Sequence, residues 1–115
     1  MAQKFDNNAG STLAAPIAST DLVLVVASAV LFPVLTNPSD YFYATLADAN
    51  EDTWEIVKVT ATSGTSFSVQ RGQDGTTALA WISGTTFEMR PVAQGLRDIL
   101  AAAYARSTAM SLALG

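Results

Sequence analysis

Few residues in this chain have the types and spacing to carry chemistry, and the pair Glu55 and Arg71 is the first to consider. A carboxylate and a guanidinium can act as a catalytic acid and an electrostatic clamp. No second carboxylate is placed for hydrolytic acid-base work, and no nucleophile has an evident base. The chain has no histidine and no cysteine, which removes the commonest general base and zinc ligand, together with thiolate metal sites. We therefore predict a structural ion pair, no cofactor and no enzyme activity, because buried charges need partners.

A glycine-rich segment, RGQDGTT at residues 71–77, has the composition of a phosphate-binding loop. It lacks the Lys-Ser/Thr ending of a P-loop, and no helical pattern begins there. Tight turns explain the segment better, because Asp-Gly is a strong turn dipeptide. We predict that Gly72, Asp74 and Gly75 serve turn geometry.

Acidic residues cluster in DANED, residues 48–52, which match the first half of a calcium-binding loop. Thr53 and Val59 stand where an EF-hand needs glycine and glutamate. A solvated hairpin turn is the better interpretation. No metal site is expected there.

Large aromatic side chains offer one more kind of site, a sugar-binding platform. The candidates are Trp54, Trp81, Tyr41 and Tyr43. Packing in the core or against another subunit is the usual role of such residues. A carbohydrate-binding module nevertheless stays open as an alternative.

Composition favours a small domain that contacts other chains. Of 115 residues, 50% are hydrophobic and only 14% are charged, below the roughly 25% of an average domain. Part of the surface is therefore expected to be buried, most simply in a homo-oligomer. Six Lys and Arg residues and a net charge of -4 argue against nucleic-acid binding. The apolar run at residues 22–35 contains Pro33 and is too short to span a membrane, which takes about 20 residues.

Residues 1–20 are rich in Asn, Ala, Ser and Thr, and they cannot bury enough apolar area to fold alone. We expect an extended N-terminal arm, with a disordered terminus as the alternative. Its isolated apolar residues Phe5, Leu13 and Ile17 are candidates for docking on this domain or on a neighbouring subunit.

Apolar patterning then predicts two strands. Residues 21–26 are continuously apolar after Asp21, which indicates a strand buried on both faces. Residues 41–46 alternate, so Phe42, Ala44 and Leu46 share one face. Tyr41 and Tyr43 share the other with Thr45. Because aromatic side chains are costly in water, this outer face is a candidate subunit interface.

Residues 54–61 and 66–71 predict a central hairpin whose register can be argued. Pairing Phe67 and Val69 with Ala61 and Val59 keeps one face apolar, and it requires an odd loop or a bulge at Gly64. An even loop is the alternative. The preferred register also places the Glu55 and Arg71 side chains on the same face.

The last elements are a strand at residues 85–90, with Phe87 and Met89 inward, and a helix at residues 91–106 after Pro91. An amphipathic stripe supports the helix and comprises Val92, Leu96, Ile99, Leu100 and Ala103. In the tail, Met110, Leu112 and Leu114 alternate, which makes them candidate subunit contacts.

These elements predict an all-β fold, a small antiparallel β-barrel or sandwich of about five strands with an extended N-terminal arm and one C-terminal α-helix. The expected organisation is an arm at 1–20, a β-domain at 21–90, and a helix and tail at 91–115.

One ordered combination, EIVKVT at 55–60, RGQDGTTA at 71–78 and AW at 80–81, resembles the small β-domain of tail fibre, baseplate and related virion proteins of tailed bacteriophages. The resemblance runs from about residue 32 to residue 100. It implies a non-enzymatic virion protein, an adaptor that joins a fibre to a tail or collar and assembles with other virion proteins. A capsid decoration protein is the alternative within virions.

Overall fold

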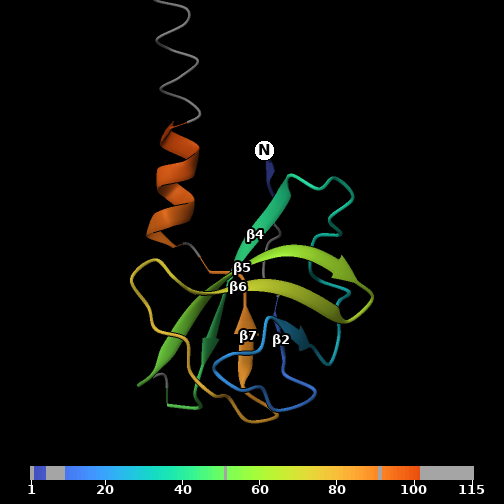
Figure 1. Ribbon diagram of the computed structural model, residues 1–115, viewed down its shortest axis with the longest axis vertical. Helices are drawn as coiled ribbons and strands as arrows, with labels where there is room; N and C mark the ends of the chain where they lie inside the picture. Colours follow the sequence, from blue (N-terminus) through green and yellow to red (C-terminus); the bar gives the residue numbers. More distant parts are fainter. Residues whose placement is uncertain (1, 5–9, 51, 91, 102–115) are drawn as a thin grey trace, which may run out of the picture.

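The computed structural model describes residues 2–4, 10–50, 52–90 and 92–101. These form a mostly antiparallel β-sheet followed by one C-terminal helix (Figure 1), which confirms the predicted fold class. The described strands are β1 (Ala2–Gln3), β2 (Gly10–Thr12), β3 (Val23–Val25), β4 (Asp40–Ala47), β5 (Trp54–Ser63), β6 (Ser66–Gln73) and β7 (Thr86–Glu88). They exceed the expected number because β1 and β2 come from the segment predicted to be an arm.

The strands form one sheet that nearly closes on itself. Their order is β2-β7-β4-β5-β6-β3, with antiparallel neighbours, while β1 pairs in parallel with β4. A bridge between Leu13 and Val26 joins the two ends of this order. Next to it, the Ala14 amide donates to the Val25 carbonyl oxygen at 2.8 Å. The domain is therefore a partly closed barrel, and such closure leaves few unpaired strand edges.

The core lies inside this barrel and follows from the alternation of the long strands. Side chains Phe42, Ala44 and Leu46 of β4 point inward and are fully buried, as predicted. Four phenylalanines meet at the centre, with neighbouring ring centroids 5.3–5.9 Å apart: Phe32, Phe42, Phe67 and Phe87. Large aromatic rings thus supply much of the buried apolar area of a short chain.

The N-terminal segment is part of the β-domain, and the prediction of a separate arm is wrong for its described residues. β1 and β2 lie in the sheet, and Leu13 and Ile17 are buried in the core. Ile17 also exchanges backbone hydrogen bonds of 2.9 and 3.0 Å with Trp81. The segment cannot fold alone, but β7 and the loop around Trp81 supply its pairing partners. Phe5 lies outside the described residues.

Strand β3 departs from the prediction of burial on both faces. Leu24 points into the core, whereas Val23 and Val25 are exposed. β3 stands at one end of the strand order, and no described element covers its outer face. An unbroken apolar run fits a strand that is buried on both faces and also one that is buried on a single face, because it has no polar residues at alternate positions to indicate an exposed face.

The hairpin of β5 and β6 is confirmed, with a partly different register. Val59 lies opposite Val69 as predicted, but Phe67 lies opposite Thr62, one position beyond the predicted partner. The pairing has two irregularities, between Ile56 and Lys58 and between Val59 and Ala61, and neither falls at Gly64. A two-residue turn containing Gly64, whose φ is 58°, connects the strands.

The C-terminal part begins with β7, where Phe87 is fully buried as predicted and Met89 packs against the core. Residues 93–101 are helical. The remainder of the predicted helix and the tail residues Met110, Leu112 and Leu114 lie outside the described residues. Within the described chain, no helix has the length and apolar character needed to cross a membrane.

Candidate functional site

The predicted pair of Glu55 and Arg71 exists and forms the most highly connected polar site in the described structure. The two side chains come from the neighbouring strands β5 and β6, and Glu55 is fully buried. Arg71 Nε donates to Glu55 Oε2 at 2.7 Å, and Arg71 Nη2 donates to Oε1 at 2.9 Å. A guanidinium matches a carboxylate in this two-bond geometry. The prediction of a structural ion pair is confirmed.

Three further donors complete the environment of Glu55. The Gly72 amide donates to Oε2 at 3.0 Å, while the Leu79 amide and Trp81 Nε1 donate to Oε1 at 2.9 and 3.0 Å. Burial raises the pKa of Glu55, but the hydrogen bonds from Arg71, Trp81, Leu79 and Gly72 outweigh it and bring the pKa below its ordinary value. Glu55 is therefore held as a carboxylate.

Arg71 uses its other donors on three backbone carbonyl groups. Nη1 donates to Ala18 and Asp21, each at 2.8 Å, and Nη2 donates to Leu79. The ion pair thus connects β5 and β6 with the loop before β3 and the segment before Trp81. Its donors and acceptors are engaged inside the domain, so this arrangement serves to hold segments together.

The RGQDGTT segment follows Arg71 and turns sharply. Asp74 and Gly75, with φ values of 52° and 80°, form the turn after β6, as predicted. Gly72, with a φ of 58°, lies instead within β6, where the pairing with β5 shifts register, so the prediction of a turn is wrong for this residue. A Cβ atom on Gly72 would lie 3.1 Å from the Thr76 carbonyl oxygen and 3.2 Å from the Ala78 nitrogen. Glycine at this position therefore permits both the backbone conformation and the close return of the chain.

Asp74 has a second role that the sequence reasoning missed. Its Oδ2 accepts a 3.2 Å hydrogen bond from the Gln94 amide at the start of the helix, and its Oδ1 accepts a 2.6 Å bond from Arg97. The hydrogen bond from Arg97, with the smaller contributions of the helix-start amides, lowers the pKa of Asp74. One signal was available, since residues 92–95, VAQG, lack a capping side chain of their own. The carboxylate of Asp74, on a turn distant in the sequence, supplies the cap.

Tyr41 and Tyr43 do not form an exposed contact surface, and that prediction is wrong. Both are buried with Ile56 and Val92 in a second, smaller core beneath the start of the helix. Their hydroxyl groups donate to the same oxygen, Oδ2 of Asp98, at 2.6 and 3.0 Å. The helix of the same chain therefore covers the face of β4 that carries Tyr41 and Tyr43, so these aromatic side chains are not exposed to water.

Burial against the helix changes the titration of the tyrosines. Burial and then the hydrogen bond to Asp98 raise the pKa of Tyr41 to about 12. The same two causes raise the pKa of Tyr43. Lys58 Nζ lies 4.3 Å from the centre of the Tyr41 ring and adds a cation–π contact.

Gly95 allows the helix to approach the sheet closely. A Cβ atom there would lie 2.7 Å from Gln3 Oε1 and 3.5 Å from the Tyr43 ring. Gln3 Nε2 also donates to the Gly95 carbonyl oxygen at 3.1 Å. Glycine is unfavourable inside a helix, but here the absence of a side chain is what permits docking.

The proposed sugar platform is not assembled. Tyr41, Tyr43 and Trp81 are buried, and Trp81 is engaged with Glu55, so Trp54 alone of the four is widely exposed. In the acidic segment, Asp48 Oδ1 accepts from the Asp52 amide at 2.8 Å, as in a local turn. Among the described residues, no group of three acidic side chains is placed to hold a metal ion.

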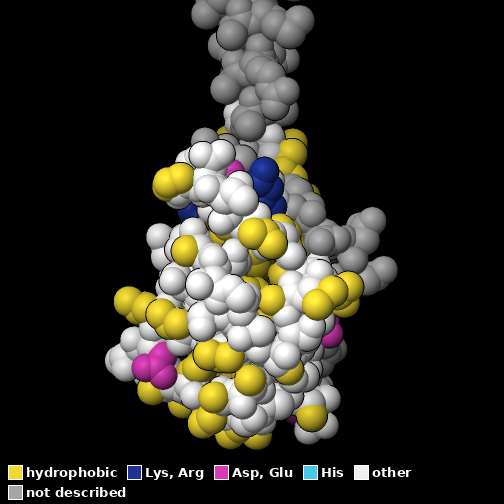
Figure 2. All heavy atoms as spheres, turned by 90° about the vertical axis from the view of Figure 1, so that its right-hand side faces the viewer, with side chains coloured by type: hydrophobic (Ala, Val, Ile, Leu, Met, Phe, Trp, Pro, Cys, Tyr) yellow, Lys and Arg dark blue, Asp and Glu magenta, His cyan; other side chains and the backbone are white. Residues whose placement is uncertain are grey.

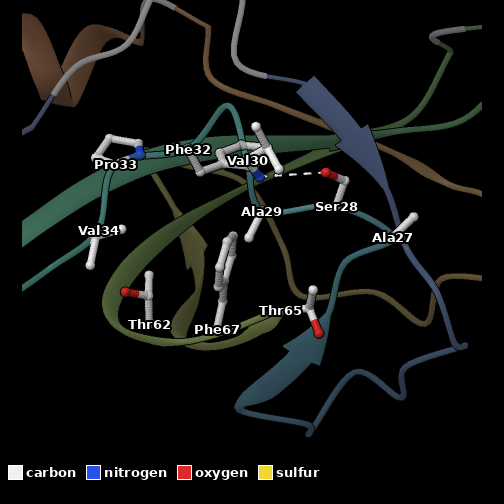
Figure 3. A pocket seen from close by; sticks show the side chains of 11 residues that line it. Ala27, Ser28, Ala29, Val30, Phe32, Pro33, Val34, Thr62, Thr65 and Phe67 are labelled. Carbon is white, nitrogen blue, oxygen red and sulfur yellow. Dashed lines mark hydrogen bonds between the residues drawn. The ribbon is translucent and has the colours of Figure 1, made fainter.

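A shallow apolar hollow of about 480 Å³ lies between residues 27–34 and the tip of the hairpin. Figure 3 shows Ala29 pointing toward the ring of Phe67, with Ser28, Thr62 and Thr65 as the polar side chains around it. The Leu35 amide donates to Thr62 Oγ1 at 3.1 Å, so this hydroxyl holds the loop. The lining contains no charged group, and the hollow is suited to apolar contact only.

No protein-family model matches the sequence, and no curated protein matches it. Glu55, Arg71, Gly72, Asp74 and Trp81 are all engaged in contacts within the domain.

Proposed function

We propose that this protein is a non-enzymatic structural component of a bacteriophage virion, an adaptor that attaches a fibre to the tail and assembles as a symmetric oligomer. One observation carries the proposal. The residues responsible for the resemblance to virion β-domains make contacts inside the domain. Glu55 and Arg71 hydrogen-bond to one another and join four chain segments, and Asp74 holds the helix. A motif used in this way builds a rigid scaffold, which is what a load-transmitting attachment domain needs.

The outer surface supports a role in assembly. Large apolar side chains are exposed at several places, among them at and just before β3 (Leu22, Val23, Val25), in the following loop (Val30, Leu31, Val34) and on the helix (Leu96, Ile99, Leu100). Figure 2 shows hydrophobic side chains spread over the visible face and few charged groups among them. Contiguous exposed apolar area on a small domain marks contact sites for other chains.

The buried polar side chains of the described residues are all paired within the domain. Within residues 2–4, 10–50, 52–90 and 92–101, no buried side-chain nitrogen or oxygen lacks a hydrogen-bond partner. A polar group aimed into a pocket is the usual mark of a binding or catalytic site. The proposed carbohydrate-binding role has no aromatic platform to support it.

The test is to locate the protein in purified particles of the virus that encodes it, using gold-labelled antibody and electron microscopy. Label at the junction of tail and fibre is the expected result. Label spread over the head would identify a decoration protein and overturn the adaptor role. Absence of the protein from particles by mass spectrometry would overturn the virion assignment altogether.

A pair of charge variants tests whether the exposed β3 face is used in assembly. Val23→Glu places a charge on that face, and Ser39→Glu adds the same charge at an exposed polar position in the turn before β4, away from β3. We expect both proteins to fold, with only Val23→Glu poorly incorporated into particles. Equal incorporation would remove the β3 face from the proposal.

A further inference from the structure

The helix at residues 93–101 has two different faces. Its inner face is docked on the β-domain through Val92, Gly95 and Asp98, which meet the Tyr41 and Tyr43 side. Figure 1 shows the helix standing at one end of the sheet, extending away from the strands. Only one side of the helix can therefore be covered by its own domain.

The opposite face is apolar although it is exposed. Leu96 and Leu100 are 55% and 66% exposed, Ile99 lies beside them, and Ala93 continues the stripe one turn earlier. A surface helix of a single domain normally turns charged or polar residues to this side. The two leucines thus lack the apolar neighbours that their side chains would need for burial.

The spacing of these residues identifies the kind of partner. Positions 93, 96, 100, 103, 107, 110 and 114 are separated by alternating steps of three and four, and they hold Ala, Leu, Leu, Ala, Ser, Met and Leu. This is the heptad spacing of a coiled coil, in which apolar residues at every third and fourth position form a seam between helices. The seam starts on the exposed face that the structure describes, at Ala93, Leu96 and Leu100.

We propose that this outer helix face packs in parallel and in register against the same face of a second copy of the chain. The inference rests on the proposed function for its symmetric oligomer, and it names the surface that joins the copies. A second copy fits because every copy presents the same stripe. Parallel pairing fits because it sets Leu96 against Leu96 and Leu100 against Leu100, the like-with-like contacts of a heptad seam.

Sedimentation of the purified full chain tests the contact without any virus particle. The wild type is expected to sediment as an oligomer, and the double variant Leu96→Gln and Leu100→Gln as a single chain. Ala101→Gln is the matched control, because Ala101 is exposed on the same helix but lies outside the seam. Near-ultraviolet circular dichroism checks that the environment of Trp81 is unchanged. A monomeric wild type, or a double variant that stays oligomeric, overturns the proposal.

Disulfide trapping gives a readout that does not depend on a disruptive variant. The chain has no cysteine, so a single one can be introduced at Leu100 or, as the control, at Ala101. Parallel in-register packing brings each seam residue close to its own copy, within the short separation that a disulfide requires. Leu100→Cys should therefore form a covalent dimer on mild oxidation, and Ala101→Cys should not. Equal cross-linking by the two variants, or none by Leu100→Cys, contradicts the inference even if the particle experiment supports the adaptor role.

Discussion

Arg71 donates two hydrogen bonds to the fully buried carboxylate of Glu55, at 2.7 and 2.9 Å. The pair also binds backbone groups of the loop before β3 and of the segment that leads to Trp81. Residues far apart in the sequence therefore depend on one charge pair for their relative positions. The most direct predictions concern this pair.

Glu55→Gln should lower the free energy of unfolding by about 3–5 kcal/mol, because it leaves the buried Arg71 without its counter-charge. Glu88→Gln is the matched control, since Glu88 is a partly exposed carboxylate paired with Arg90 at 3.0 Å, and a loss below about 1 kcal/mol is expected there. Urea denaturation measures both. In a double-mutant cycle, Glu55→Ala and Arg71→Ala should be far from additive. Additive losses would mean that the two side chains do not interact.

The docking of the helix should weaken in acid. Burial raises the pKa of Asp98, but hydrogen bonds from Tyr41, Gln94 and Tyr43 bring it below the ordinary value of 3.8. A carboxylate with a depressed pKa contributes stability that is complete above its unfolded pKa and is lost as the pH falls through the folded one. The protection factors of the helix amides against hydrogen exchange should therefore fall below about pH 4. Asp98→Asn should show low protection at neutral pH and a smaller acid step, because the carboxylate of Asp74, which also holds the helix, still titrates. An unchanged profile would count against this role.

The contact between Tyr41 and Asp98 also predicts that Tyr41 ionises at an unusually high pH. The pKa of Tyr41 is raised from 10.0 to about 12, so its contribution to stability is complete below pH 10 and is lost as the pH rises toward 12. Absorbance titration in a Tyr104→Phe background should show ionisation well above the ordinary range. Adding Asp98→Asn should lower the apparent pKa, because the carboxylate favours the neutral phenol. Normal titration of both buried tyrosines in the parent protein would contradict the docked helix.

Two glycines with the same φ of 58° provide a matched test of the RGQDGTT turn. Gly64→Ala should cost about 1–2 kcal/mol, the ordinary penalty of a left-handed conformation, because a Cβ there meets nothing within 4 Å. Gly72→Ala should cost clearly more, since its Cβ would press on the backbone of Thr76 and Ala78 at 3.1 and 3.2 Å. Thermal or urea unfolding of the two variants decides the order. Equal losses would show that the turn can relax.

The N-terminal segment should behave as part of the core. Leu13→Ala should cost about 2–5 kcal/mol, as expected for a large side chain removed from a packed interior. Leu22→Ala removes the same atoms from a side chain that is 61% exposed, and it should be nearly neutral. Urea denaturation again compares the two. A small loss at Leu13 would restore the interpretation of residues 1–20 as an arm outside the domain.

Local patterns were enough to predict the elements that are close in sequence. The alternating residues 41–46 predicted β4, and the strand-forming segments of the hairpin predicted β5 and β6. The shared face of Glu55 and Arg71 followed from the two-residue period of a strand. The turn at Asp74 and Gly75 followed from residue types that tolerate positive φ, whereas the position of Gly72 within β6 did not. The bulge after Val59 was misplaced because a bulge depends on how the whole sheet curves.

What covers each face was decided only by the tertiary structure. The sequence by itself determined that Tyr41 and Tyr43 share a face, but the helix that buries them through Asp98 comes from more than fifty residues later. From the sequence, Leu13 and Ile17 were isolated apolar residues, but closure of the sheet buried both. The run at 21–26 was predicted to be buried, but Val23 and Val25 are exposed. The physical reason is that periodicity reports which side chains point the same way along one element. Burial depends on the other element that arrives there, and that partner is set by long-range packing.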